Sequence, residues 1–306
     1  MIISRALCFC IACFCVLALV PQAFSQQVAL TIDDLPAHGS LPPGMTRADV
    51  AKIMLKELKD AHAPKVYGFI NARKLEEHPE DLEVLKLWRR AGFPLGNHTY
   101  AHLSLNASSA DDFDQNVARD EPTLKSLMGH QNWHWFRYPY LWEGDTLEKR
   151  HAVRQYLKDH KYHIAQVTLD FEDYLWNGPY ARCVEKNDAA SIEWLKSSYM
   201  STAAEYIALD QSMSKLVFGR DIKHVLLLHI GSFETVMLAQ LLDSLRRHGF
   251  RFITLPEAEK DRAYKSDPDV ALKEGGTLLD QMMEARHLDF PPHNDKPYDQ
   301  LDALCR

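Results

Sequence analysis

The chain is poor in cysteine outside its first 25 residues. Only Cys183 and Cys305 lie beyond that segment; the other four of the six cysteines are Cys8, Cys10, Cys13 and Cys15. Two cysteines can form one disulfide at most, which excludes a disulfide scaffold. Repeats, low-complexity stretches and a long Pro/Gly linker before residue 255 are also absent. This favours one large domain over several linked small ones.

An excess of positive charge is missing as well. The formal net charge is −7, and it becomes −8 when Arg5 is removed with the first 25 residues. An acidic balance argues against a phosphate backbone as partner, so we expect no nucleic-acid binding. A neutral or cationic substrate fits this charge better.

The first 25 residues resemble a secretory leader. Arg5 precedes the apolar run from Ala6 to Val20, and Ala23-Phe24-Ser25 is typical of a cleavage site. We therefore expect residues 1–25 to be a signal peptide and the protein to be exported, either periplasmic or extracellular. The alternative is an uncleaved leader that acts as an anchor. After cleavage no stable membrane partner is expected.

Removing 25 residues from 306 leaves 281, enough for one large α/β domain. Apolar runs that predict buried strands alternate with helical patterns, which favours a parallel sheet with helices outside it. About seven strands suggest a distorted (β/α) barrel. The expected strands are Val28 to Ile32, Val66 to Ile70, Pro94 to Asn97, Trp135 to Tyr138, Ile164 to Leu169, Val225 to His229 and Phe250 to Thr254.

The helical patterns have readable limits. We expect one or two helices within 188–218, and single helices at Arg47 to Ala61, Pro79 to Ala91, Ser109 to Met128, Thr235 to Arg247 and Thr277 to Arg286. After Leu255 the pattern weakens. We therefore expect a catalytic domain over residues 26–255 and a C-terminal appendage over residues 256–306, packed on the barrel or trailing it.

Acidic and imidazole side chains follow two of the expected strands. Asp33 and Asp34 end the first strand, and His98 and His102 are four residues apart after the third. On a helical turn this spacing would let both imidazoles reach one ion. Asp34, His98 and His102 would then supply the three ligands of a catalytic metal site, with Asp33 as general base. The alternatives are an aspartate cap and an ordinary surface histidine pair.

Two more strand ends carry charged groups. Arg137 lies before Pro139 and could hold Asp33 in a charge-assisted pair, while a backbone N–H after the proline could serve as an oxyanion donor. His229 ends the sixth strand and, with an acid from the preceding strand end, could act as a general acid. A structural ion pair and a satisfied core histidine are the alternatives.

The motifs in their order resemble those of a known family. Thr-x-Asp-Asp, His-x-x-x-His, Arg-x-Pro-Tyr, Asp-x-x-Asp before an aromatic, and Leu-x-His look like the five motifs of the polysaccharide deacetylases of the NodB-homology family, carbohydrate esterase family 4. The resemblance spans about residues 28–255. It implies a NodB-like distorted (β/α) barrel. The chain departs from the usual pattern at Ile32, Leu35 and Tyr174.

The resemblance implies roles for individual residues. Asp33 becomes the general base, and Asp34, His98 and His102 hold one divalent metal ion, with zinc expected and cobalt or nickel as alternatives. Further roles are an orienting Arg137, an oxyanion-binding N–H of Tyr140, a general acid His229 paired with Asp173, and Leu227 in the pocket for the acetyl methyl. Trp142 and Trp176 could stack on sugar rings, or could simply pack.

The function implied is removal of N-acetyl groups from a glycan of chitin-oligosaccharide or peptidoglycan type, with release of acetate. An acetylated glycan is the expected partner. The alternatives are an O-acetyl esterase on an acetylxylan-like polymer, a hydrolase of a small non-sugar amide, and an inactive glycan-binding homologue.

Overall fold

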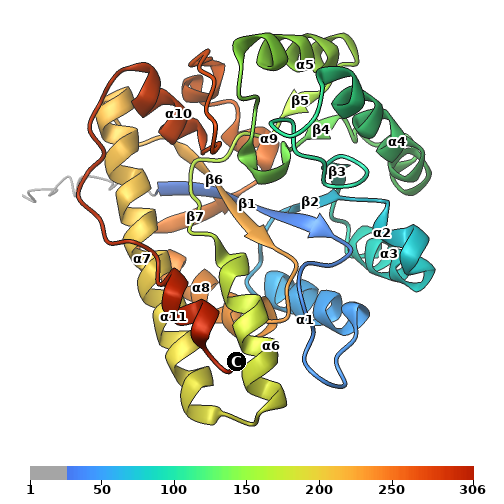
Figure 1. The fold of residues 1–306 in the computed structure, drawn as a ribbon, viewed down its shortest axis with the longest axis vertical. Helices are drawn as coiled ribbons and strands as arrows, with labels where there is room; N and C mark the ends of the chain where they lie inside the picture. The colour runs from blue at the N-terminus through green and yellow to red at the C-terminus, as the bar shows by residue number, and fades with distance from the viewer. Residues whose placement is uncertain (1–25) are drawn as a thin grey trace, which may run out of the picture.

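The computed structural model describes residues 26–306, and its centre is a parallel sheet built around β1 (Gln26–Leu35). The strand order is β5-β4-β3-β2-β1-β6, and β7 pairs with β1. Every pairing is parallel. The sheet curls without closing completely, and helices surround it (Figure 1). The expected α/β barrel of about seven strands is confirmed. The other strands are β2 (Tyr67–Ile70), β3 (Leu95–Asn97), β4 (Trp135–Phe136), β5 (His163–Ile164), β6 (Lys223–His229) and β7 (Phe250–Ile253).

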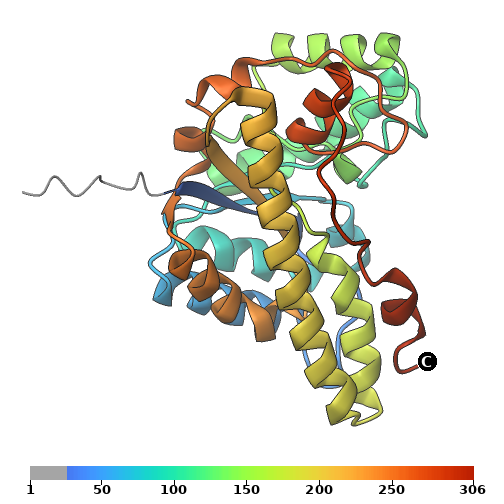
Figure 2. The same cartoon turned by 90° about the vertical axis from the view of Figure 1, so that its left-hand side faces the viewer.

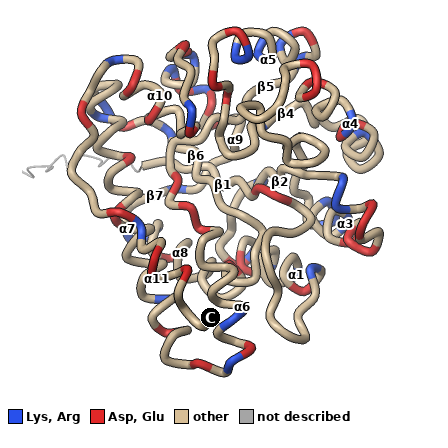
Figure 3. The backbone as a smooth tube through the Cα atoms, viewed as in Figure 1, with Lys and Arg blue, Asp and Glu red and all other residues tan. Residues whose placement is uncertain are grey.

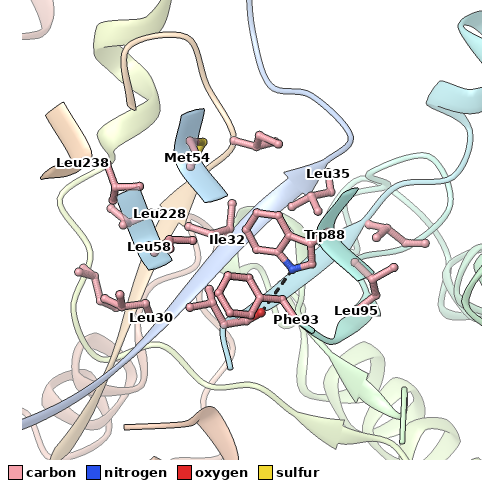
Figure 4. Packing of buried hydrophobic residues seen from close by; sticks show 14 of the residues in the cluster. Leu30, Ile32, Leu35, Met54, Leu58, Trp88, Phe93, Leu95, Leu228 and Leu238 are labelled. Atoms are coloured by element: carbon pink, nitrogen blue, oxygen red, sulfur yellow. Dashed lines mark hydrogen bonds between the residues drawn. The ribbon is translucent and has the colours of Figure 1, made fainter. Parts of the chain in front are cut away.

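Alternate residues of β1 serve different faces, as the pleat of a strand requires. Leu30 and Ile32 pack into the cluster beneath the helices, where they meet Met54 and Leu58 of α1 (Arg47–Asp60) (Figure 4). Ala29 belongs instead to the smaller apolar cluster on the opposite face. By the same alternation Thr31 and Asp33 point to that inner face.

The expected helices form, with caps that explain where they start. Thr46 makes a capping box with Asp49 at the start of α1, and Ser109 caps the next long helix through the N–H of Asp112. The expected helices observed here are α3 (Leu82–Arg90), α4 (Ala110–Met128), α7 (Ala189–Phe218), α8 (Glu234–Arg247) and α10 (Leu278–Ala285); further helices are α2 (Lys74–Glu77), α5 (Leu147–Asp159), α6 (Asn177–Glu185), α9 (Leu255–Ala258) and α11 (Tyr298–Ala303).

The expected strand from Ile164 to Leu169 is wrong as one continuous element. β5 ends at Ile164, and Leu169 forms only an isolated bridge with Leu226 of β6. The N–H of Ala165 still donates to Phe136 on β4 (2.7 Å), while Leu169 accepts from Leu227 (3.1 Å). The segment therefore crosses from one edge of the sheet to the other, and it cannot follow a single neighbouring strand.

The C-terminal segment packs against α7. Apolar side chains of α10, among them Leu279 and Met283, share a cluster with Met213 of α7. In Figures 1 and 2 the last residues run along α7 and end beside α6. There a disulfide joins Cys183 to Cys305. The division at residue 255 thus falls between elements that contact one another closely.

The described residues carry charge both in the middle of the molecule and on its outer helices (Figure 3). Acidic segments lie in the middle of the molecule near β1 and β6, and both signs of charge occur on the outer helices (Figure 3). Within residues 26–306 no helix combines the length and the hydropathy that a membrane span requires. The expected leader, residues 1–25, lies outside the described residues.

Candidate active site

A cleft of about 300 Å³ opens where the strands end. The carboxyl ends of parallel strands meet at one edge of the sheet, so side chains that are far apart in sequence converge there. All the predicted side chains except Trp176 line this cleft or contact a residue that lines it. The lining includes Asp33, Asp34, His98, His102, Tyr140, Trp142, Leu227 and His229.

Three side chains form a possible metal centre. One ligand atom each from Asp34, His98 and His102 lies within 4.8 Å of the others. The Nε2 of His102 is 3.4 Å and that of His98 3.8 Å from Oδ1 of Asp34. This Oδ1 is buried and accepts no hydrogen bond, and the Nζ of Lys74 stays 3.7 Å away, so the oxygen is left open to a further cation. The donor set and the orphaned oxygen both fit a divalent metal ion.

The turn that carries the histidines differs from the expected one. Residues 98–102 are not helical, because Thr99 and His102 adopt positive φ angles of 60° and 51°. The side chain of Asn97 stabilises this turn by accepting from the N–H of Thr99 (2.9 Å). The two imidazoles still come together, with their ring centroids 4.8 Å apart.

The protonation states suit metal binding. The Nδ1 of His98 lies 2.8 Å from the carbonyl oxygen of Arg137. A carbonyl can only accept, so the proton sits on Nδ1 and Nε2 is left free. Burial lowers the pKa of His98 well below its usual range and that of His102 to about 4. Both imidazoles are therefore neutral at pH 7, as ligation requires.

Asp34 is ionised for a different reason. Its burial opposes charge, but Lys74 and a hydrogen bond from His38 outweigh this and hold its pKa well below the usual range. The Lys74 Nζ is 3.7 Å from Oδ1, and the Nδ1 of His38 is 2.5 Å from Oδ2. The cleft thus has one permanent carboxylate beside two neutral imidazoles.

Asp33 lies in a different environment. Burial raises its pKa to about 6, although the nearby Arg137 guanidinium opposes the rise. One terminal nitrogen of Arg137 contacts both oxygens of Asp33, at 3.2 and 3.3 Å. The guanidinium also donates to Ala165 O (2.6 Å) and to Thr31 Oγ1 (3.1 Å), which fixes its plane. A buried carboxyl with a pKa near neutrality is well suited to accept a proton.

His229, partly buried in the wall of the cleft, pairs with the buried Asp173. The ring Nδ1 of His229 is 2.7 Å from Oδ1 of Asp173, and its backbone N–H donates to Oδ2 (2.8 Å). His229 is in register with Asp33 across the β1–β6 ladder. Burial would lower the pKa of His229, but Asp173 raises it to about 10. The imidazole is thus protonated at neutral pH.

The remaining predicted residues divide into two groups. Leu227, Tyr140 and Trp142 line the cleft, and Trp142 is anchored by a hydrogen bond from its Nε1 to Glu274 O (2.8 Å). The expected stacking role of Trp176 is wrong in this structure. Trp176 is fully buried and donates its indole N–H to Ser198 Oγ (2.8 Å), so no ring face is open to a sugar.

Two residues of the site were not expected from the sequence. His38 and Lys74 both contact Asp34, yet neither belongs to a recognised motif. The only sequence signal for His38 is its position four residues after Asp34, in a Pro/Gly loop. Lys74 carries no such signal, because a lysine at the start of a short helix usually faces solvent.

Comparison with known proteins shows which class of proteins this chain resembles. The family model described as "Polysaccharide deacetylase" matches residues 23–165. A chitin deacetylase of Arthroderma benhamiae is 22% identical over 234 residues, covering 76% of this chain and 52% of that protein. A peptidoglycan-N-acetylglucosamine deacetylase of Bacillus cereus is 27% identical over 161 residues, covering 53% and 50%. The chain spans about half the length of these curated relatives.

Solved structures agree on the fold. The chitin deacetylase from Colletotrichum lindemuthianum superposes with a TM-score of 0.51 at 23% identity, covering 76% of this chain and 88% of that one. A family 4 carbohydrate esterase pseudoenzyme from Bacillus anthracis gives a TM-score of 0.51 at 17% identity, covering 77% and 66%. The resemblance indicated by the motifs is confirmed: the chain is related to the NodB-type polysaccharide deacetylases of carbohydrate esterase family 4.

Proposed function

We propose that this protein is a metal-dependent hydrolase that removes N-acetyl groups from a glycan of chitin-oligosaccharide or peptidoglycan type. It would cleave a carbon–nitrogen bond outside peptides and release acetate. One observation carries the proposal: the orphaned Oδ1 of Asp34 faces two neutral imidazoles, while a carboxyl and a charged histidine line the same cleft. The relatives' printed activities point to the same reaction.

Asp34, His98 and His102 would hold the ion. Two imidazoles and one carboxylate favour zinc, with cobalt or nickel as alternatives. When bound, such a cation polarises the acetyl carbonyl and lowers the pKa of water.

The chain's own side chains would move the protons. Asp33 would accept one from the attacking water, and its contacts with Arg137 would keep it oriented. As the carbon–nitrogen bond breaks, His229 would donate a proton to the leaving amine. Asp173 would keep that imidazole charged until this step.

Two groups would bind the acetyl unit. The backbone N–H of Tyr140 would donate to the oxyanion that develops from the carbonyl, and Leu227 would contact the methyl group. Trp142, half-buried at the rim of the cleft, would offer a surface to a sugar ring. In this proposal residues 26–255 carry the chemistry, and residues 256–306 complete the wall through Glu274.

The same proposal includes export through a leader at residues 1–25. The disulfide between Cys183 and Cys305 supports it, since such bonds persist in oxidising compartments.

The test is acetate release from N-acetylated chitooligosaccharides, peptidoglycan and O-acetylated xylan, with and without chelator. Release from an N-acetylated glycan that chelator stops supports the proposal. Release from xylan alone would make the protein an O-acetyl esterase. No acetate release from any of these substrates, with metal bound, would favour a hydrolase of a non-sugar amide. Sugar affinity without turnover would indicate a glycan-binding homologue.

Two matched variants test which aspartate is the general base and which is the metal ligand. Asp33→Asn should abolish turnover while zinc remains bound, and Asp34→Asn should lose zinc. The reverse pattern would exchange their roles.

A further inference from the structure

We propose that His38 is a positioning residue for Asp34, fixing one carboxylate oxygen so that the other points at the two ligand histidines. This inference rests on the proposed function. It concerns the loop of residues 35–39. This loop begins at Leu35, where the chain departs from the usual pattern of the polysaccharide deacetylases.

The two oxygens of Asp34 have distinct surroundings. Oδ2 lies 2.5 Å from the Nδ1 of His38. Oδ1 has no hydrogen-bond partner and is the oxygen that faces His102 (3.4 Å) and His98 (3.8 Å), with the Nζ of Lys74 3.7 Å away. A carboxylate that is hydrogen-bonded through one oxygen presents the other as a single, oriented ligand atom. His38 therefore selects which oxygen of Asp34 is available to an ion.

The backbone of the loop is held from three directions. The N–H of His38 donates to Ile230 O (2.9 Å), next to the end of β6, and its carbonyl accepts from Asn177 Nδ2 of α6 (2.9 Å). Lys74 of α2 donates to Ala37 O (2.8 Å) and Asp34 O (3.1 Å). Because the backbone of the loop is held in this way, little backbone freedom remains to be lost when the imidazole of His38 contacts Asp34.

The ring of His38 also faces the rest of the cleft. Its centroid is 5.0 Å from that of His229 and 5.5 Å from that of Tyr174. His38 is not among the three residues whose ligand atoms all lie within 4.8 Å of one another. This geometry assigns His38 to the positioning of Asp34. The three proposed metal ligands remain the side chains of Asp34, His98 and His102.

The experiment measures Zn²⁺ affinity by competition with a chromophoric chelator. The proteins compared are the wild type, His38→Ala and His38→Gln, whose amide can still donate a hydrogen bond. A matched control is His151→Ala, which removes an exposed histidine–carboxylate pair with Asp269 (2.6 Å) that does not line the cleft. Loss of a support of this kind weakens metal binding about 10–100-fold.

We expect that loss for His38→Ala, partial recovery for His38→Gln, and wild-type affinity for His151→Ala. With Co²⁺ in place of Zn²⁺, the visible spectrum of His38→Ala should change while one ion per chain is still bound. Circular dichroism checks that each variant is folded.

Three outcomes would overturn the inference. Equal Zn²⁺ affinity of folded His38→Ala and wild type would show that the hydrogen bond does not position Asp34. A loss in His38→Gln as complete as in Asp34→Asn would make His38 a ligand itself. A wild type that binds no Zn²⁺ would overturn this inference and the proposed function together, whereas the first two results would leave that function intact.

Discussion

Asp173 holds His229 at two points, its backbone N–H (2.8 Å) and its ring Nδ1 (2.7 Å). Asp173 is itself buried, so solvent competes for neither bond. The imidazole is thus fixed in orientation as well as in charge. A proton donor that must meet one nitrogen of a bound substrate gains from both.

Replacing Asp173 by Asn should lower kcat about 10²–10⁴-fold, the usual contribution of a positioned proton donor. The amide cannot stabilise the imidazolium, so the pKa of His229 should fall from its raised value. Steady-state kinetics and a titration of the ring by NMR measure the two effects. Zn²⁺ affinity is the control and should not change; wild-type kcat in this variant would remove His229 from the mechanism.

The same pair makes stability depend on pH. The pKa of His229 is about 10 in the folded protein and about 6.5 when unfolded, so the folded chain binds the extra proton between these values. Its contribution is complete below pH 6.5 and is lost as the pH rises through 10.

For metal-free protein, urea titrations should show the free energy of unfolding falling more steeply over that range in the wild type than in His229→Gln. Below pH 6.5 the two curves should run parallel. Equal slopes above pH 6.5 would contradict the raised pKa.

Metal should stabilise the folded chain, because the ligands of the cluster converge only after folding. At a free Zn²⁺ concentration of 100 times Kd, the gain in unfolding free energy is about 2.7 kcal/mol. Thermal denaturation should show a higher Tm with Zn²⁺ and its reversal by chelator. His102→Ala should lose the response and His151→Ala should keep it; a wild type whose Tm ignores Zn²⁺ would contradict the site.

The disulfide between Cys183 and Cys305 should stabilise the fold by restricting the unfolded chain. It links residues 122 apart, and loops of that length correspond to about 3–5 kcal/mol. Urea denaturation of the wild type with reductant should therefore show a lower unfolding free energy. Cys183→Ser should show the lower value with or without reductant. Any response of this variant to reductant would point to another cause.

Much of the site could be predicted because its residues follow apolar strands. Asp33 and His229 follow apolar runs that form β1 and β6, and parallel strands bring their carboxyl ends together. Local pattern was sufficient there. Spacing also identified the pair of His98 and His102, although the turn between them has left-handed residues and no helix.

The remainder depends on contacts that sequence pattern does not record. Trp176 is buried because its ring packs beside those of Phe171 and Tyr199, and nothing near it in sequence distinguishes a rim aromatic from a packed one. Lys74 meets Asp34 across 40 residues of chain. The strand expected up to Leu169 fails because that segment changes partner from β4 to β6.

The site also has a conformational cost. Asp34, His102 and Tyr140 hold positive φ angles of 68°, 51° and 60°, a region that disfavours side chains with a Cβ by about 1–2 kcal/mol. Glycine at any of the three would relieve that strain, while at Asp34 or His102 it would remove a ligand of the proposed metal site. Under the proposed function, a single substitution to glycine at Asp34 or His102 would thus exchange a proposed metal ligand for relief of backbone strain.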